Sequence, residues 1–163
     1  MKRPKMKREY GIRLTILSLF LVLLFPHCTK GPQPMRLEFR LAQMEPGEGL
    51  TEMTFDPTGE KLYLHDEVLI DNRDVSSAKA ADWGGQYVVD LIFTAAGKEK
   101  LARITGEHVA EKMGILVDGR LLSAPMINAP ILEGRAVIVG DFTQEEAQRI
   151  AAGIQAGLPA KQP

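Results

Sequence analysis

The chain has 163 residues, enough for one folded domain, and its 45% hydrophobic and 25% charged residues are typical of a globular protein. The formal net charge of −1 hides an uneven distribution, because residues 1–27 carry six Lys and Arg and one acidic residue, which leaves fourteen basic against twenty acidic side chains in the rest. An acidic body argues against nucleic acid as a partner, since phosphates require a basic face on the folded part.

The first element in chain order is a short apolar run, residues 14–25, behind the basic head. A transmembrane helix needs about 20 apolar residues, so this run is short for a permanent span. A basic stretch followed by an apolar segment of this length is typical of a secretory signal peptide. We therefore interpret residues 1–27 as a signal peptide or membrane anchor. The rest of the chain is expected outside the cytoplasm, in the bacterial cell envelope.

Cys28 is the single cysteine, so the chain cannot form an internal disulfide. Its position just after the apolar run resembles the lipid acceptor of bacterial lipoprotein signals, which implies attachment to the membrane through acyl chains. His27 stands where those signals carry a small residue, and an uncleaved anchor or cleavage further along the chain is therefore the alternative. We assign residues 28–60 to a tether with an N-terminal strand and loop, and residues 61–160 to a folded domain.

The first half of the folded part is predicted to contain three strands and one short helix. Residues 35–44 alternate apolar and polar side chains, which indicates a half-buried strand, whereas residues 45–60 are rich in Gly, Pro and Glu and are interpreted as a loop. Residues 61–70 form a second strand. Asp74 is predicted to cap a short helix over 75–82. Residues 84–93 are β-branched and aromatic and favour a further strand.

The second half begins with a helix over 95–105, for which Thr94 is the predicted N-cap. Asp118 and Gly119 then separate two apolar runs, which is a strong signal for a hairpin with a type I′ turn, because both central residues of that turn need positive φ. Pro125 lacks a backbone donor, so the strand pairing is expected to end there, and the chain as far as Pro130 is expected to run at a sheet edge or to leave the sheet.

The last helix is the best-specified element of the sequence. Thr143 and Glu146 have the spacing of a capping box, and Gly157 supplies a C-terminal stop. One apolar stripe follows at helical spacing, made of Ala147, Ile150, Ala151 and Ile154. The pattern as a whole predicts a single small α+β domain, in which helices pack on one face of a mostly antiparallel sheet.

The sequence offers little support for catalysis. No set of His, Cys or carboxylate residues has the spacing of a zinc site, and no glycine-rich phosphate loop is present, so no metal or cofactor is predicted. Ser123 lacks the Gly-x-Ser-x-Gly frame of a hydrolase nucleophile. We interpret it as a strand residue before an edge proline. The alternative is an envelope hydrolase in which Ser123 meets His65 or His108 only in three dimensions.

Three aromatic side chains, Tyr63, Trp83 and Tyr87, stand in or next to predicted strands. Exposed aromatic residues anchor many protein interfaces. Since aromatic residues at strand starts also fill cores without any binding role, we interpret all three as core residues.

Three long stretches of the sequence resemble one domain family in order and spacing. They are LYLHDEVLIDNRDVSSA, VVDLIFTAAGKEKLARIT and GILVDGRLLSAPMINAPILEGRAVIVGDFTQEEAQRIAAGIQAGLPA. The features that recur in the family fall on Asp118-Gly119, Ser123-Ala124-Pro125, Gly140, residues 142–147 and residues 157–159. The family is the head subdomain of the large extracytoplasmic domain of SecD, a membrane subunit of the bacterial protein-export machinery, and the resemblance covers about residues 61–160.

The resemblance implies a domain that contacts exported polypeptides or other subunits of the export machinery. In that family the proton-driven step belongs to a bundle of membrane helices, so a head domain by itself is expected to bind and not to catalyse. We therefore predict a membrane-tethered, non-catalytic binding module, and an exposed sheet edge near the prolines would accept an extended peptide by β-augmentation. A structural remnant without an export role is the remaining alternative.

Overall fold

The structure, a computed structural model, describes residues 31–55 and 58–160. The predicted signal peptide or anchor at 1–27 and the predicted lipid acceptor Cys28 lie outside the described residues. Over the two described stretches, no helix has both the length and the apolar character needed to cross a membrane.

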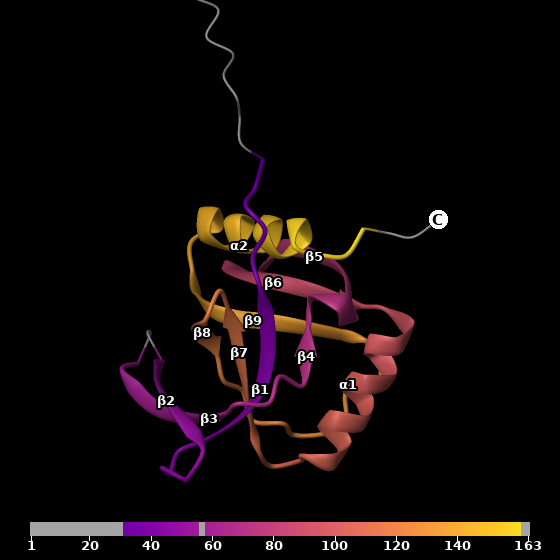
Figure 1. The fold of residues 1–163 in the computed structure, drawn as a ribbon. Coiled ribbons are helices and arrows are strands. Elements are labelled where there is room, and N and C mark those ends of the chain that lie inside the picture. Colours follow the sequence, from indigo (N-terminus) through magenta and orange to yellow (C-terminus); the bar gives the residue numbers. More distant parts are fainter. Residues whose placement is uncertain (1–30, 56–57, 161–163) are drawn as a thin grey trace, which may run out of the picture.

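The described chain has more strand than helix, and its two α-helices lie in the second half of the sequence (Figure 1). The elements in chain order are β1 Leu37–Gln43, β2 Leu50–Phe55, β3 Glu60–His65, β4 Ile70–Asp71, the 3₁₀ turn η1 Asn72–Asp74, β5 Val75–Trp83, β6 Gln86–Phe93, α1 Ala95–Glu107, β7 Lys112–Val117, β8 Arg120–Ser123, β9 Arg135–Phe142 and α2 Gln144–Ala156.

The larger sheet has the strand order β2-β3-β1-β7-β8, with β4 pairing to β1, and the strand pairs are antiparallel. Its alternation sends Leu37 and Phe39 of β1 to one face, into the main core. The other face holds a second, smaller core with Leu62, Leu64 and Leu116. β2 also comes close to β8, so the sheet curls around this smaller core.

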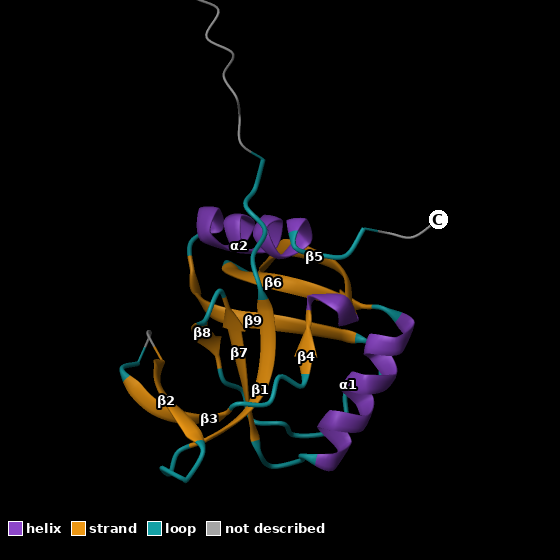
Figure 2. Cartoon of the chain, in the orientation of Figure 1, coloured by secondary structure: helices purple, strands orange, loops and turns teal. Residues whose placement is uncertain are grey.

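The smaller sheet has the order β5-β6-β9 and is also antiparallel. Helix α2 packs along one face of it, mainly on β5 and β6 (Figure 2). Ile150 and Ile154 of α2 join Val89 and Leu91 of β6 in the main core, to which both helices contribute. The predicted α+β class with mostly antiparallel pairing is confirmed, although the strands form two sheets where the sequence indicated one.

The predicted helix starts are confirmed. The Thr94 hydroxyl accepts a hydrogen bond from the Gly97 N–H, and α1 begins at the next residue. Thr143 and Glu146 form the reciprocal capping box of α2, with the Thr143 N–H donating to the Glu146 carboxylate over 3.0 Å. The N-termini of α1 and α2 are thus capped by residues that the sequence alone identifies.

The helix predicted over residues 75–82 is wrong, because this segment is strand β5. Its buried positions, Val75 and Ala78, are three residues apart, which fits one face of a helix, and alanine is a good helix former. The competing signal is the Gly84-Gly85 turn, whose positive φ values of 66° and 96° allow β5 to fold back onto β6. The residues after Asp74 are a strand, and the Asp74 carboxylate closes the capping box of η1 with Asp71.

The loop predicted over residues 45–60 is also partly wrong, since residues 50–55 form strand β2. β2 pairs with β3 over its whole length, from Leu50 opposite His65 to Phe55 opposite Glu60. The predicted domain boundary at residue 61 therefore falls inside β3, and β1 lies in the middle of the larger sheet.

Candidate functional site

The Asp118-Gly119 turn has the predicted positive φ at both residues, 49° and 76°. The Asp118 carboxylate has an additional role that the sequence does not indicate. Its Oδ1 accepts a hydrogen bond from the Arg36 N–H over 2.8 Å, and the Asp118 N–H donates to the Arg36 carbonyl over 2.9 Å. This side chain therefore ties the β7–β8 hairpin to the chain just before β1.

Ser123 is buried at the end of β8, opposite Ile115 of β7. The expectation that strand pairing ends at Pro125 is wrong. The Pro125 carbonyl accepts a hydrogen bond from the Met113 N–H over 2.9 Å, and a β-bridge between Met126 and Lys112 follows it. Proline lacks a donor but keeps its acceptor, so Ala124-Pro125 interrupts the pairing without ending it.

Gly140 lies within β9, where the ring of Phe142 folds back over its backbone. A Cβ at this position would stand 2.5 Å from the Cζ of Phe142, so a larger side chain would displace the ring. Asp118 and Gly119 thus form the turn, Ser123 lies in β8, and Gly140 leaves room for the ring of Phe142.

The structure does not bring the candidate catalytic residues together. His108 Nδ1 lies 3.2 Å from Glu111 Oε1, at the end of α1. In the described stretches, no hydrogen bond links Ser123 to His108 or to His65, and no group of three or more His, Cys, Asp or Glu residues could hold a metal ion.

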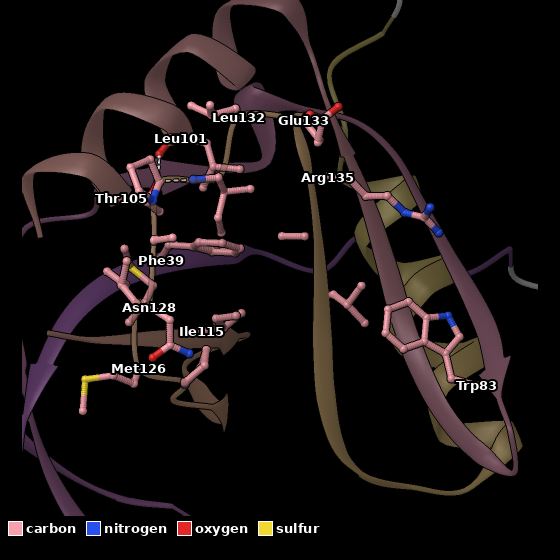
Figure 3. Close-up of a pocket in the computed structure, with 18 residues that line it drawn as sticks. Phe39, Trp83, Leu101, Thr105, Ile115, Met126, Asn128, Leu132, Glu133 and Arg135 are labelled. Carbon is pink, nitrogen blue, oxygen red and sulfur yellow. Dashed lines mark hydrogen bonds between the residues drawn. The ribbon is translucent and has the colours of Figure 1, made fainter. Parts of the chain in front are cut away.

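The described residues form an open apolar groove of about 730 Å³, a volume within the range of ~300–1,000 Å³ usual for ligand sites. It is bounded by the segment 125–133 on one side and by the start of β9 on the other. Further lining residues come from β1, α1, β7 and the end of β5; the side chains that Figure 3 labels are Phe39, Trp83, Leu101, Thr105, Ile115, Met126, Asn128, Leu132, Glu133 and Arg135.

The segment 125–133 is held in place by hydrogen bonds at both ends. At one end Ile127 donates to the Glu111 carbonyl and accepts from the Ala110 N–H, each over 2.8 Å. At the other end the buried Thr105 hydroxyl accepts from the Ile131 N–H over 2.8 Å and donates to the Leu101 carbonyl over 2.7 Å (Figure 3). This wall of the groove is therefore fixed before any ligand arrives.

Trp83 lies at the far end of the groove, with Arg135, across from Met126 and Asn128 (Figure 3). Its side chain is 52% exposed, so the interpretation of Trp83 as a core residue is wrong. Met126 and Leu132 on the opposite wall are also exposed, at 47% and 61%. The sequence signal for this site was the pair of prolines. We interpreted them as a sheet edge and did not predict that residues 125–133 form one wall of a groove.

Charge is sparse in the groove. Arg135 forms a bidentate ion pair with Asp90, with N···O distances of 2.7 and 2.8 Å, and this pairing raises the pKa of the Arg135 guanidinium. Glu133 stands exposed at the rim and has no ion-pair or hydrogen-bond partner within residues 31–55 and 58–160. The groove thus presents apolar walls and one negative charge.

Comparison with known proteins extends the resemblance seen in the sequence. A family model for the SecDF P1 head subdomain matches residues 48–160. The chain is 47% identical over 74 residues to the protein translocase subunit SecD of Magnetococcus marinus, covering 45% of this chain and 14% of that protein. It is 36% identical over 100 residues to SecD of Acidaminococcus fermentans, covering 60% and 24%.

Solved structures agree. A crystal structure of SecDF in a super-membrane-facing form matches with a TM-score of 0.63 and 28% identity, over 78% of this chain and 19% of that one. The chain thus spans less than a quarter of the length of these relatives. Because the family model covers more than half of the sequence, the chain belongs to the SecDF P1 head subdomain family.

Proposed function

We propose that this chain is a membrane-tethered, extracytoplasmic head domain that binds extended segments of exported polypeptides, without catalysis, in the groove between residues 125–133 and β9. The relatives are named protein translocase subunits, and one structural neighbour, 28% identical with a TM-score of 0.62, is described as a membrane component that enhances protein export. The observation that carries the proposal is the preformed apolar groove of about 730 Å³.

The chemistry of the groove suits an unfolded chain. Trp83, Met126 and Leu132 offer large apolar surfaces that are already exposed, so binding a partner would remove them from water. Methionine side chains adapt to ligands of varied shape, which a domain that meets many exported sequences requires.

The absence of catalysis is part of the proposal. Ser123 lies buried on β8, and His108 contacts Glu111 at the end of α1. A nucleophile needs a base within hydrogen-bond reach. The alternative, an envelope hydrolase, requires activity on an ester substrate that Ser123→Ala abolishes while the fold survives.

The tether is proposed on the sequence of residues 1–28. Replacing Cys28 with Ser should move the protein out of the membrane fraction if the thiol carries acyl chains. Retention of that variant in the membrane would favour an uncleaved anchor.

Photocrosslinking in living cells tests the binding role. The probe is placed singly at Met126, Leu132 and Trp83, and at Gln148 on the exposed face of α2 as the matched control. We expect crosslinks to many newly exported chains from the three groove positions and few from Gln148. A single unrelated envelope partner, or equal yields from groove and control, would contradict the proposed function.

A further inference from the structure

The free edge of β9 is the feature that goes furthest beyond the proposed function. β9 is the last strand of the order β5-β6-β9, and on its outer side it has no backbone hydrogen-bond partner among the described residues. The other outer strand of this sheet is different, because the Gln155 side chain of α2 accepts a hydrogen bond from the Ala78 N–H over 2.9 Å. Within the described residues, the β5 edge thus forms a hydrogen bond to another element, whereas the β9 edge has no such bond from its backbone.

The register identifies which backbone groups of β9 point outward. The Phe93 N–H donates to the Gly134 carbonyl over 2.9 Å, and from there the pairs with β6 alternate along the strand. Ala136 and Ile138 fall on the positions that bond to β6. Arg135 and Val137 fall on the positions between them, so their N–H and C=O groups point away from β6.

These outward groups lie in the groove. Its lining includes Arg135, Ala136 and Val137 together, although alternate residues of a strand face opposite sides of the sheet. Ala136 packs against the main core, whereas Trp83 of the same groove is exposed. Side chains of both faces can line one groove only if it passes over the edge of the strand.

We propose that the occupant of the groove pairs with this edge as an added β-strand, and that the domain therefore recognises the backbone of an extended, mainly apolar polypeptide with a basic residue at one end. The inference rests on the proposed function, and it places strand addition on β9 instead of the proline-containing edge predicted from the sequence. Backbone pairing is independent of side-chain identity, so it suits a site that must accept many sequences.

The charge of the groove favours a basic residue at one end of the bound segment. Arg135 is neutralised by Asp90, so Glu133 supplies the unbalanced charge of the lining. A lysine or arginine at the end of the bound segment that meets the rim complements it. Because Glu133 is exposed, this contact contributes only a few-fold in affinity and serves to orient the strand.

The test uses the full chain in detergent and a synthetic peptide of about seven residues, long enough to pair with the open part of β9, that alternates valine and threonine and ends in lysine. A second peptide has the same side chains but carries esters in place of two adjacent central amides, which removes one donor from each edge of the strand. Trp83, the single tryptophan of the chain, reports binding through its fluorescence. We expect the ester peptide to bind at least about tenfold more weakly.

Two further measurements use the protein side of the contact. On binding, the amide protons of Arg135 and Val137 should become protected from exchange, whereas that of Ile138, on a position that bonds to β6, should be protected already. Val137→Pro removes an outward N–H at a sheet edge, where proline is tolerated, and should weaken binding relative to Val137→Ala. If Val137→Pro fails to fold, the comparison of the amide and ester peptides still decides whether the occupant pairs through its backbone.

The outcomes separate this inference from the proposed function. Equal binding of the two peptides, or unchanged exchange at Arg135 and Val137, overturns strand addition and leaves the groove as a site that reads side chains. If neither peptide binds at millimolar concentration, strand addition is also overturned. The crosslinking from Met126, Leu132 and Trp83 then decides separately whether the groove binds exported chains at all.

Discussion

Gly97, in the first turn of α1, gives the sharpest test of the packing. A Cβ added there would stand 2.0 Å from the backbone oxygen of Asp74, and 2.8 Å from its carbonyl carbon. The close approach lets Asp74 bind the start of α1, because its carbonyl accepts from the Thr94 N–H over 2.8 Å and its carboxylate pairs with Lys100 over 2.8 Å. The structure therefore predicts that Gly97→Ala pushes the start of α1 away from the backbone of Asp74.

Two effects of opposite sign determine the result of Gly97→Ala. Helix propensity alone favours alanine over glycine by about 1 kcal/mol. Overpacking of a rigid site costs about 1–3 kcal/mol, and here the obstacle is backbone, which cannot rotate away. Because rigid backbone is the obstacle, we take the upper part of that range, about 2–3 kcal/mol, and expect a net loss of about 1–2 kcal/mol in the free energy of unfolding.

The assay is urea unfolding followed by circular dichroism, with Gly106→Ala in the same helix as the matched control. A Cβ at Gly106 would meet its nearest neighbour, the Cγ of Pro130, at 3.7 Å, an ordinary contact. Gly106→Ala should therefore be neutral or stabilise the protein by up to about 1 kcal/mol. If Gly97→Ala is as stable as the parent or more so, the close approach of Asp74 to α1 is wrong.

Other predictions concern the turn, the cap and the candidate nucleophile. Gly119→Val should lower the free energy of unfolding by about 1–2 kcal/mol, because valine tolerates positive φ poorly; a thermal melt unchanged from the parent would contradict the turn assignment. Thr143→Ala should cost about 1 kcal/mol through loss of the cap, measured in the same way. The pKa of the Glu146 carboxyl is lowered, first by the hydrogen bond from the Thr143 N–H and then by the Thr143 hydroxyl. The stabilisation that this carboxylate gives the folded state is therefore complete at neutral pH and declines as the pH falls through the lowered pKa. Glu146→Gln should flatten that decline in acid titrations of stability. Ser123→Ala should leave crosslinking in cells unchanged, and lost function in a folded variant would support the hydrolase alternative.

Local signals in the sequence predicted the elements that short stretches determine. The type I′ turn at Asp118-Gly119, the Thr94 cap and the capping box of α2 each depend on residues within three or four positions of one another. β5 was missed because its alanines satisfy helical and strand periodicity alike, and only pairing with β6 decides between them.

The groove could not be predicted because its walls come from distant parts of the chain. Trp83 and Met126 line one recess although more than forty positions separate them in the sequence. The division into two sheets is also non-local, because β9 pairs with β6, and among the described strands β8 is the last of its sheet. Proline spacing marked an edge, but the edge that opens into the groove belongs to β9.

The way the chain enters the domain has a consequence for engineering it. The Met35 N–H donates to the Gly153 carbonyl of α2 over 2.8 Å, and a Cβ on Gly157 would lie 2.6 Å from the Met35 oxygen. The entrance before β1 and the exit after α2 are therefore neighbours. A circular permutant that joins these two points with a short linker and opens the chain at the exposed Glu48-Gly49 turn between β1 and β2, which does not line the groove, should keep the groove intact. Such a permutant would carry the groove as an insert in an unrelated host protein.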